Sequence, residues 1–171
     1  MQIGTFSYGL AAIAFGVLTT LMLMSWRGRI QGALLTAAAA MSTLWASVAA
    51  YQVAVGRPAL LIADLAEIFR DAFWLAFLIT VLAVAGIRHQ SLQRAIRVVA
   101  LAIGAFCLSL IALILFRTPD VLQAFSIPDY FTGIMGRMVL ALIGVVIIHQ
   151  LYLNVQPEQR WGIKFLCLGA G

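Results

Sequence analysis

Four ionisable side chains interrupt an otherwise apolar stretch of the sequence. Asp64, Glu67, Arg70 and Asp71 fall within eight residues, and their spacing places Asp64, Glu67 and Asp71 along one face of a helix. Ionisable groups inside a membrane are costly, and they usually face the interior of a helix bundle or a wet cavity. Arg137 lies near the start of another apolar stretch, and we expect it to pair with one of these acids.

Two interpretations of this cluster remain open. In the first, the helix extends past the lipid and its charged side chains are solvated or paired with one another. In the second, Asp64, Glu67, Arg70, Asp71 and Arg137 line an outward-facing polar pocket that detects a ligand, an ion or a change in the state of the cell envelope. The second interpretation makes these five residues the candidate sensing site.

Other residues with the chemistry for catalysis or metal binding are few and scattered. His89 and His149 are far apart, Cys107 and Cys167 lie within apolar runs, and the sequence lacks a glycine-rich phosphate loop, H-E-x-x-H, C-x-x-C and G-x-S-x-G. Each histidine lacks a second ligand at helical spacing. We therefore predict no catalytic residue, no bound cofactor and no metal site within these residues.

The composition restricts the fold to a membrane protein. Of the 171 residues, 64% are hydrophobic and 10% are charged, and the mean hydropathy is +1.05. Soluble domains are about 45–50% apolar and about 25% charged, and disordered chains are poorer still in apolar residues. Two cysteines cannot build a disulfide scaffold. The sequence predicts an all-α, polytopic bundle of transmembrane helices, with the lipid bilayer as its first partner.

The apolar segments predict five full spans and the start of a sixth. A crossing needs about 20 apolar residues, and the last segment has only 11, or about 16 Å of helix. We therefore expect residues 1–171 to be the N-terminal part of a longer protein; a short re-entrant or interfacial helix is the alternative. The expected spans are 6–26, 32–55, 61–87, 98–116, 134–153 and 161–171.

Features between and within the spans predict their arrangement. The second segment is rich in alanine, serine and threonine, and small side chains allow close approach of membrane helices. We therefore expect 32–55 to be the central helix. Residues 88–97 are expected to form a basic inner loop, and 118–133 an outer loop.

The distribution of charge predicts that the N-terminus lies outside. Basic residues concentrate in the cytoplasmic connections of membrane proteins, and this orientation places most of them inside. The basic composition is then explained by topology, so no nucleic acid is expected as a partner. The inner basic residues are Arg27, Arg29, Arg88, Arg94, Arg97, Arg160 and Lys164, and the outer ones are Arg57, Arg70, Arg117 and Arg137.

Two stretches resemble a known family of membrane proteins. Residues 151–169, LYLNVQPEQRWGIKFLCLG, are similar to an inner loop and the following span in the sensor histidine kinase of PEP-CTERM/exosortase systems. Residues 67–78, EIFRDAFWLAFL, resemble the third helix of that membrane region. These stretches cover about 30 residues, and the spacing of the apolar segments fits over the whole chain.

The resemblance implies that these residues are the signal-input region of a two-component kinase in the bacterial inner membrane. It implies cytoplasmic GAF-like and kinase domains beyond residue 171 that use ATP and Mg²⁺, a homodimer formed by the full-length protein, and a response regulator as partner. It also implies control of genes linked to exopolysaccharide and protein sorting. A small transporter or permease subunit and an integral membrane enzyme are the alternatives that the residues leave open.

Overall fold

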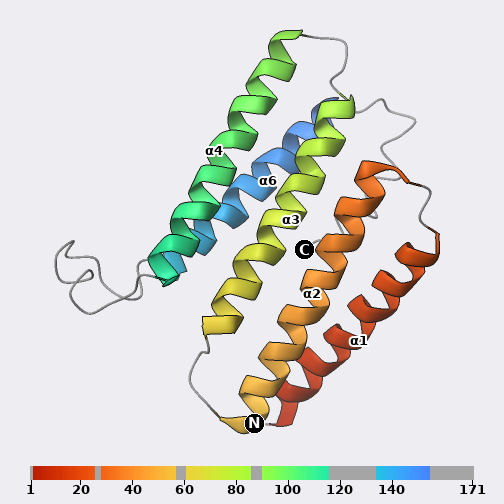
Figure 1. Ribbon diagram of the computed structural model, residues 1–171, viewed down its shortest axis with the longest axis vertical. Coiled ribbons are helices and arrows are strands. Elements are labelled where there is room, and N and C mark those ends of the chain that lie inside the picture. Colours follow the sequence, from red (N-terminus) through yellow and green to blue (C-terminus); the bar gives the residue numbers. More distant parts are fainter. Residues whose placement is uncertain (1, 26–27, 57–60, 86–89, 116–133, 155–171) are drawn as a thin grey trace, which may run out of the picture.

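The chain folds into long helices that lie side by side (Figure 1). A computed structural model describes residues 2–25, 28–56, 61–85, 90–115 and 134–154. Within these ranges the regular elements are all helical: α1 (Gln2–Met24), α2 (Ile30–Val55), α3 (Leu61–Ala85), α4 (Gln90–Leu115) and α6 (Gly136–Asn154). The all-α architecture is as predicted, whereas the predicted span 161–171 lies outside the described residues.

Four of these helices are long and apolar enough to cross a membrane: Ile3–Met24, Ile30–Val55, Gln93–Leu115 and Gly136–Leu153. Their outer surfaces are apolar as well. On α1, for example, Ile3 is 88% exposed and Phe6 is 76% exposed, and large apolar faces of this kind are typical of helices that meet lipid. The charged helix α3 is not among the four.

The predicted helix boundaries are close to those observed, with one clear error. The predicted span 98–116 starts eight residues too late, because α4 begins at Gln90. The first turns of α4 were mistaken for part of a loop because they are rich in polar residues. Arg94 and Arg97 are exposed on this helix, whereas Ile96 is 8% exposed, which is the pattern of an amphipathic helix. The predicted basic loop therefore includes a helical part.

The helix α2 ends where the sequence predicts, and glycine is the reason. Gly56 has φ +66°, in the left-handed region, which glycine adopts without steric cost. Its N–H donates to the carbonyl oxygen of Gln52 at 2.9 Å, satisfying one of the carbonyl groups that a helix end leaves without a partner.

Hydroxyl groups along the helices bond to the backbone of their own helix. Thr36 donates to the carbonyl oxygen of Gly32 at 2.8 Å, Ser42 to that of Ala38 at 2.8 Å, and Thr80 to that of Ala76 at 2.7 Å. Such bonds one helical turn back satisfy a hydroxyl in an environment without water. These polar side chains are thus compatible with apolar surroundings.

Among the described helices, both α2 and α3 pack against more than one neighbour. The small residues Ala38, Ala39 and Ala46 of α2 are fully buried, and this helix lies between α1 and α3 (Figure 1). However, α3 packs against α2, α4 and α6. Bulky side chains on α3 fill its contacts, and the main core contains Ile68, Leu75, Phe77, Leu78 and Leu82 of α3 with Ile103, Leu110, Leu140, Ile147 and Leu151 of α4 and α6.

Candidate functional site

The helices α3 and α6 run in the same direction, and this places Arg137 beside the acids of α3. Arg137 lies in the first turn of α6 and contacts Asp64 and Glu67 near the start of α3. Further along, a Cβ added to Gly144 of α6 would lie 3.7 Å from Leu75 of α3. From the first contact to the second, the residue numbers increase on both helices, as they do in a parallel pair. Two segments some 70 residues apart in the sequence therefore bring their charged residues to one end of the bundle.

Arg137 bridges two carboxylates with its two terminal nitrogens. Its Nη2 donates to Oδ1 of Asp64 at 2.5 Å, and its Nη1 lies 3.0 Å from Oε2 of Glu67. The side chains are 30%, 21% and 22% exposed for Arg137, Asp64 and Glu67. A planar guanidinium has the geometry for such a two-armed contact, which a lysine lacks. The pair joins α6 to α3 at the charged end of the bundle.

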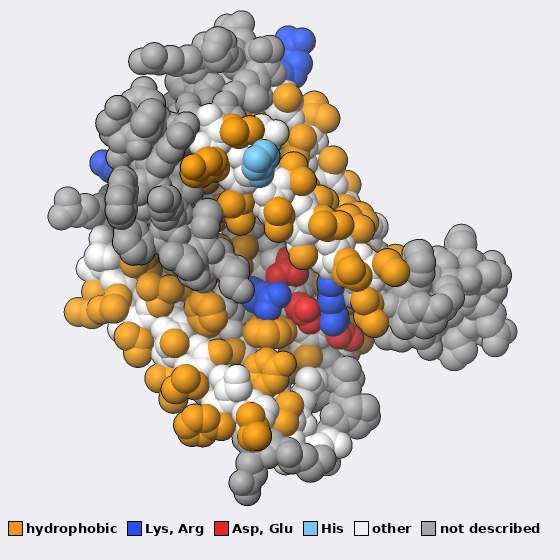
Figure 2. Space-filling view, turned by 180° about the vertical axis from the view of Figure 1, so that it is seen from behind, with side chains coloured by type: hydrophobic (Ala, Val, Ile, Leu, Met, Phe, Trp, Pro, Cys, Tyr) orange, Lys and Arg blue, Asp and Glu red, His pale blue; other side chains and the backbone are white. Residues whose placement is uncertain are grey.

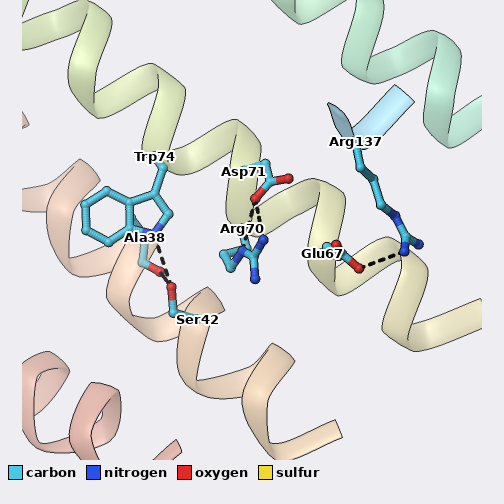
Figure 3. Close-up of polar contacts among 7 residues, drawn as sticks. All are labelled: Ala38, Ser42, Glu67, Arg70, Asp71, Trp74 and Arg137. Atoms are coloured by element: carbon cyan, nitrogen blue, oxygen red, sulfur yellow. Dashed lines mark hydrogen bonds and ion pairs between the residues drawn. The ribbon is translucent and has the colours of Figure 1, made fainter. Parts of the chain in front are cut away.

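A second ion pair lies beside the first, within α3 (Figure 3). Nε and Nη2 of Arg70 donate to Oδ1 of Asp71 at 3.0 and 2.8 Å. The guanidinium carbon of Arg70 lies 4.2 Å from the ring centroid of Trp45 on α2. A cation over an indole face is stabilised by the quadrupole of the ring. Arg70 thus connects α3 to α2, just as Arg137 connects α3 to α6.

Neutral hydrogen bonds join α3 to α2 one helical turn beyond Arg70. Nε1 of Trp74 donates to Oγ of Ser42 at 3.1 Å, and that hydroxyl donates to the carbonyl oxygen of Ala38 (Figure 3). Ser42 is 1% exposed. A buried indole N–H without an acceptor would cost about 1–3 kcal/mol, so Ser42 fixes the position of the Trp74 ring.

These side chains line a groove with a volume of about 800 Å³ between α2, α3 and α6. We call it the α3–α6 groove. Figure 2 shows charged side chains gathered in a hollow and surrounded by hydrophobic ones. Glu67, Arg70, Asp71 and Arg137 line its polar end, and the apolar remainder is lined by Leu75, Leu78, Leu140, Ala141, Gly144, Val145 and Ile148, among others.

The five candidate residues lie in one region and form two groups, one of three residues around Arg137 and one of two around Arg70. Four of them line the groove, whereas Asp64 contacts Arg137 without being one of the lining residues. Arg137 was expected to pair with one acid, and in the structure it contacts two, Asp64 and Glu67. Asp71, on the same predicted face, pairs instead with its neighbour Arg70. Sequence reasoning missed Trp45 and Trp74. A sequence signal existed for Trp74, which follows Arg70 by one helical turn. None existed for Trp45, which is linked to Arg70 only through the packing of α2 against α3.

The other reactive residues do not join this site. His149 is exposed on α6, and Cys107 is buried on α4; His89 and Cys167 lie outside the described residues. Across the part of the chain that the structure describes, no group of three His, Cys, Asp or Glu side chains is arranged to hold a metal ion. The site itself brings carboxylates, guanidinium groups and an indole N–H together, which suit recognition by charge and by hydrogen bonds.

Comparisons of the chain with protein-family models, with curated proteins and with solved structures find no match.

Proposed function

We propose that this chain is the membrane-embedded input domain of a two-component sensor histidine kinase, with its N-terminus outside the bacterial inner membrane. The observation that supports a role in signal input is the bridge from Arg137 of α6 to Asp64 and Glu67 of α3, at the polar end of the α3–α6 groove. A ligand that enters the groove from the outer side would meet the residues that hold two helices together.

The arrangement of α3 and α6 would allow the binding of such a ligand to be transmitted along the helices toward the cytosol. Both helices start at the charged end and run to the opposite end of the bundle. A change in the bridge would therefore alter the relative position of their C-terminal ends. Shifts of about 1–2 Å between packed helices are a common way of passing a signal along a protein. The bulky core residues between them, including Leu75, Leu140 and Leu151, would move as packed units.

The kinase itself is proposed from the resemblance of residues 67–78 and 151–169 to the membrane region of PEP-CTERM sensor kinases. With it come the other elements of the proposal: a cytoplasmic kinase domain that uses ATP and Mg²⁺, a homodimer, and a response regulator as the partner that receives the phosphoryl group. Regulation of genes linked to exopolysaccharide is part of the same proposal.

The test is autophosphorylation of the full-length protein in lipid nanodiscs with ATP and Mg²⁺. Coupling between two sites is typically worth about 5- to 150-fold, so we expect Arg137→Met to change the rate of phosphorylation at least about fivefold. Arg97→Met, which removes an exposed arginine from α4, is the matched control and should leave the rate unchanged.

Arg137→Lys supports the same test, because it keeps the positive charge but loses the two-armed contact. We expect it to have an intermediate rate. A full-length protein without ATP-dependent phosphorylation would contradict the proposed kinase. Equal rates for the wild type, Arg137→Met and Arg137→Lys would contradict the proposed role of the bridge in the input.

A further inference from the structure

We infer that the α3–α6 groove binds a single-chain amphiphile with a positively charged amine head, such as a long-chain alkylamine. This inference names the ligand class of the proposed input site, and it rests on that proposal only for the signalling consequence. The binding itself follows from the charges, the hydrogen bonds and the shape of the groove.

The hydrogen bonds at the polar end leave acceptors for a ligand. Arg70 and Arg137 are each engaged with carboxylates, and the Trp74 N–H and the Ser42 hydroxyl have acceptors within the protein. The hydrogen bonds that the two arginines donate to the aspartates, in contrast, reach one oxygen of each: Oδ1 of Asp64 and Oδ1 of Asp71. Among the described residues, no hydrogen bond to the Oδ2 atom of either aspartate is found.

The charge of the cluster favours a cationic head over a neutral or anionic one. Three carboxylates lie against two guanidinium groups, so the cluster has a formal excess of negative charge. An ammonium group carries three N–H donors and no acceptor, which suits a cluster rich in carboxylate acceptors. Hydrogen bonds between an ammonium and a carboxylate are roughly twice as strong as neutral ones.

The remainder of the groove fits an alkyl chain. From Asp71 to Leu78 the groove follows α3 for seven residues, or about 10 Å. On the α6 side, Ala141 and Gly144 line this length of the groove with small side chains. Ile148 lines the groove further along α6. A head at Glu67 and Asp71 would therefore place its tail along an apolar channel that runs parallel to the lipid chains.

The binding experiment uses the full chain in phosphatidylcholine nanodiscs, which contain no lipid with a primary amine. Trp26 and Trp161 are replaced by phenylalanine, which leaves Trp45 and Trp74 as the tryptophans of residues 1–171. Both line the groove, so quenching that is lost in Ala141→Phe is assigned to them. The probes are dodecylamine, dodecanol and dodecanoate, each carrying bromine on the chain as a quencher. We expect saturable quenching by the amine, and only weak, non-saturating quenching by the alcohol and the carboxylate.

Variants assign the two ends of the ligand. Glu67→Gln and Asp71→Asn should each weaken amine binding about tenfold, the effect of losing one charge-assisted hydrogen bond. Ala141→Phe should block the channel, whereas Leu142→Phe, on an exposed position of α6 outside the groove lining, should bind as the wild type does. Circular dichroism and elution volume identify any variant that is misfolded. Because the two carboxylate variants test the same end of the ligand, one of them is sufficient if the other does not fold.

Equal quenching by the three probes would overturn the inference, as would wild-type affinity in both carboxylate variants. The result is independent of the kinase proposal. Saturable amine binding to a full-length protein without kinase activity would refute the kinase and leave the ligand class standing. Phosphorylation that depends on Arg137, without selective amine binding, would refute the ligand class and leave the kinase proposal standing.

Discussion

Replacing Arg137 with methionine should destabilise the helix bundle by about 2–3 kcal/mol. The substitution leaves the carboxylates of Asp64 and Glu67 without their guanidinium partner, and removing one member of a fully buried ion pair costs about 3–5 kcal/mol. The smaller value allows for the 21% and 22% exposure of the two acids. The measurement is equilibrium unfolding in mixed detergent micelles, followed by circular dichroism.

The matched variants separate the bridge from a general effect of charge. Arg97→Met removes an exposed arginine and should change the free energy of unfolding by less than about 0.5 kcal/mol. Arg137→Met combined with Asp64→Asn and Glu67→Gln should recover much of the lost stability, because neutral amides no longer require a counter-charge. A triple variant that is less stable than Arg137→Met alone would show that the acids are stabilised by something other than Arg137.

Replacing Ala39 with leucine should weaken the packing of α2 by about 1–3 kcal/mol, the usual cost of extra side-chain volume in a filled core. Ala39 is fully buried, and its neighbour Ala40 is exposed. The same substitution at Ala40 adds the same atoms at the same depth along the helix, and we expect a change within about 0.5 kcal/mol. Thermal unfolding in nanodiscs compares the two, and equal losses would contradict the observed rotation of α2.

The sequence was sufficient for the features that depend on local chemistry. The excess of apolar residues predicted the helices. The predicted span 32–55 ends with α2 at Val55, just before Gly56, whose left-handed conformation suits glycine. The spacing of Asp64, Glu67 and Asp71 placed these acids along one helix. For the first turns of α4 the same reasoning failed, because an exposed basic helix turn and a basic loop have similar composition.

Features that depend on how helices are rotated against one another were beyond sequence reasoning. Nothing in the order of residues indicates that Arg70 lies over Trp45, or that Trp74 reaches Ser42 across thirty-two positions. The packing of α3 against both α4 and α6 was also beyond the sequence, since small residues indicate a close approach of helices but not which helix is the partner. The α3–α6 groove depends on the same rotation, since residues of both helices line it, among them Leu75 of α3 and Gly144 of α6.

The bridge at one end of α3 and α6 is proposed to control the distance between the other ends of these helices. The most direct measurement is a distance distribution by double electron–electron resonance between spin labels at Val84→Cys and Leu153→Cys, with Cys107 and Cys167 replaced by alanine. Both labelled positions are exposed and lie far along their helices from Arg137. We predict that Arg137→Met shifts or broadens the distribution, whereas Arg97→Met leaves it unchanged. Identical distributions for the wild type and Arg137→Met would contradict the account.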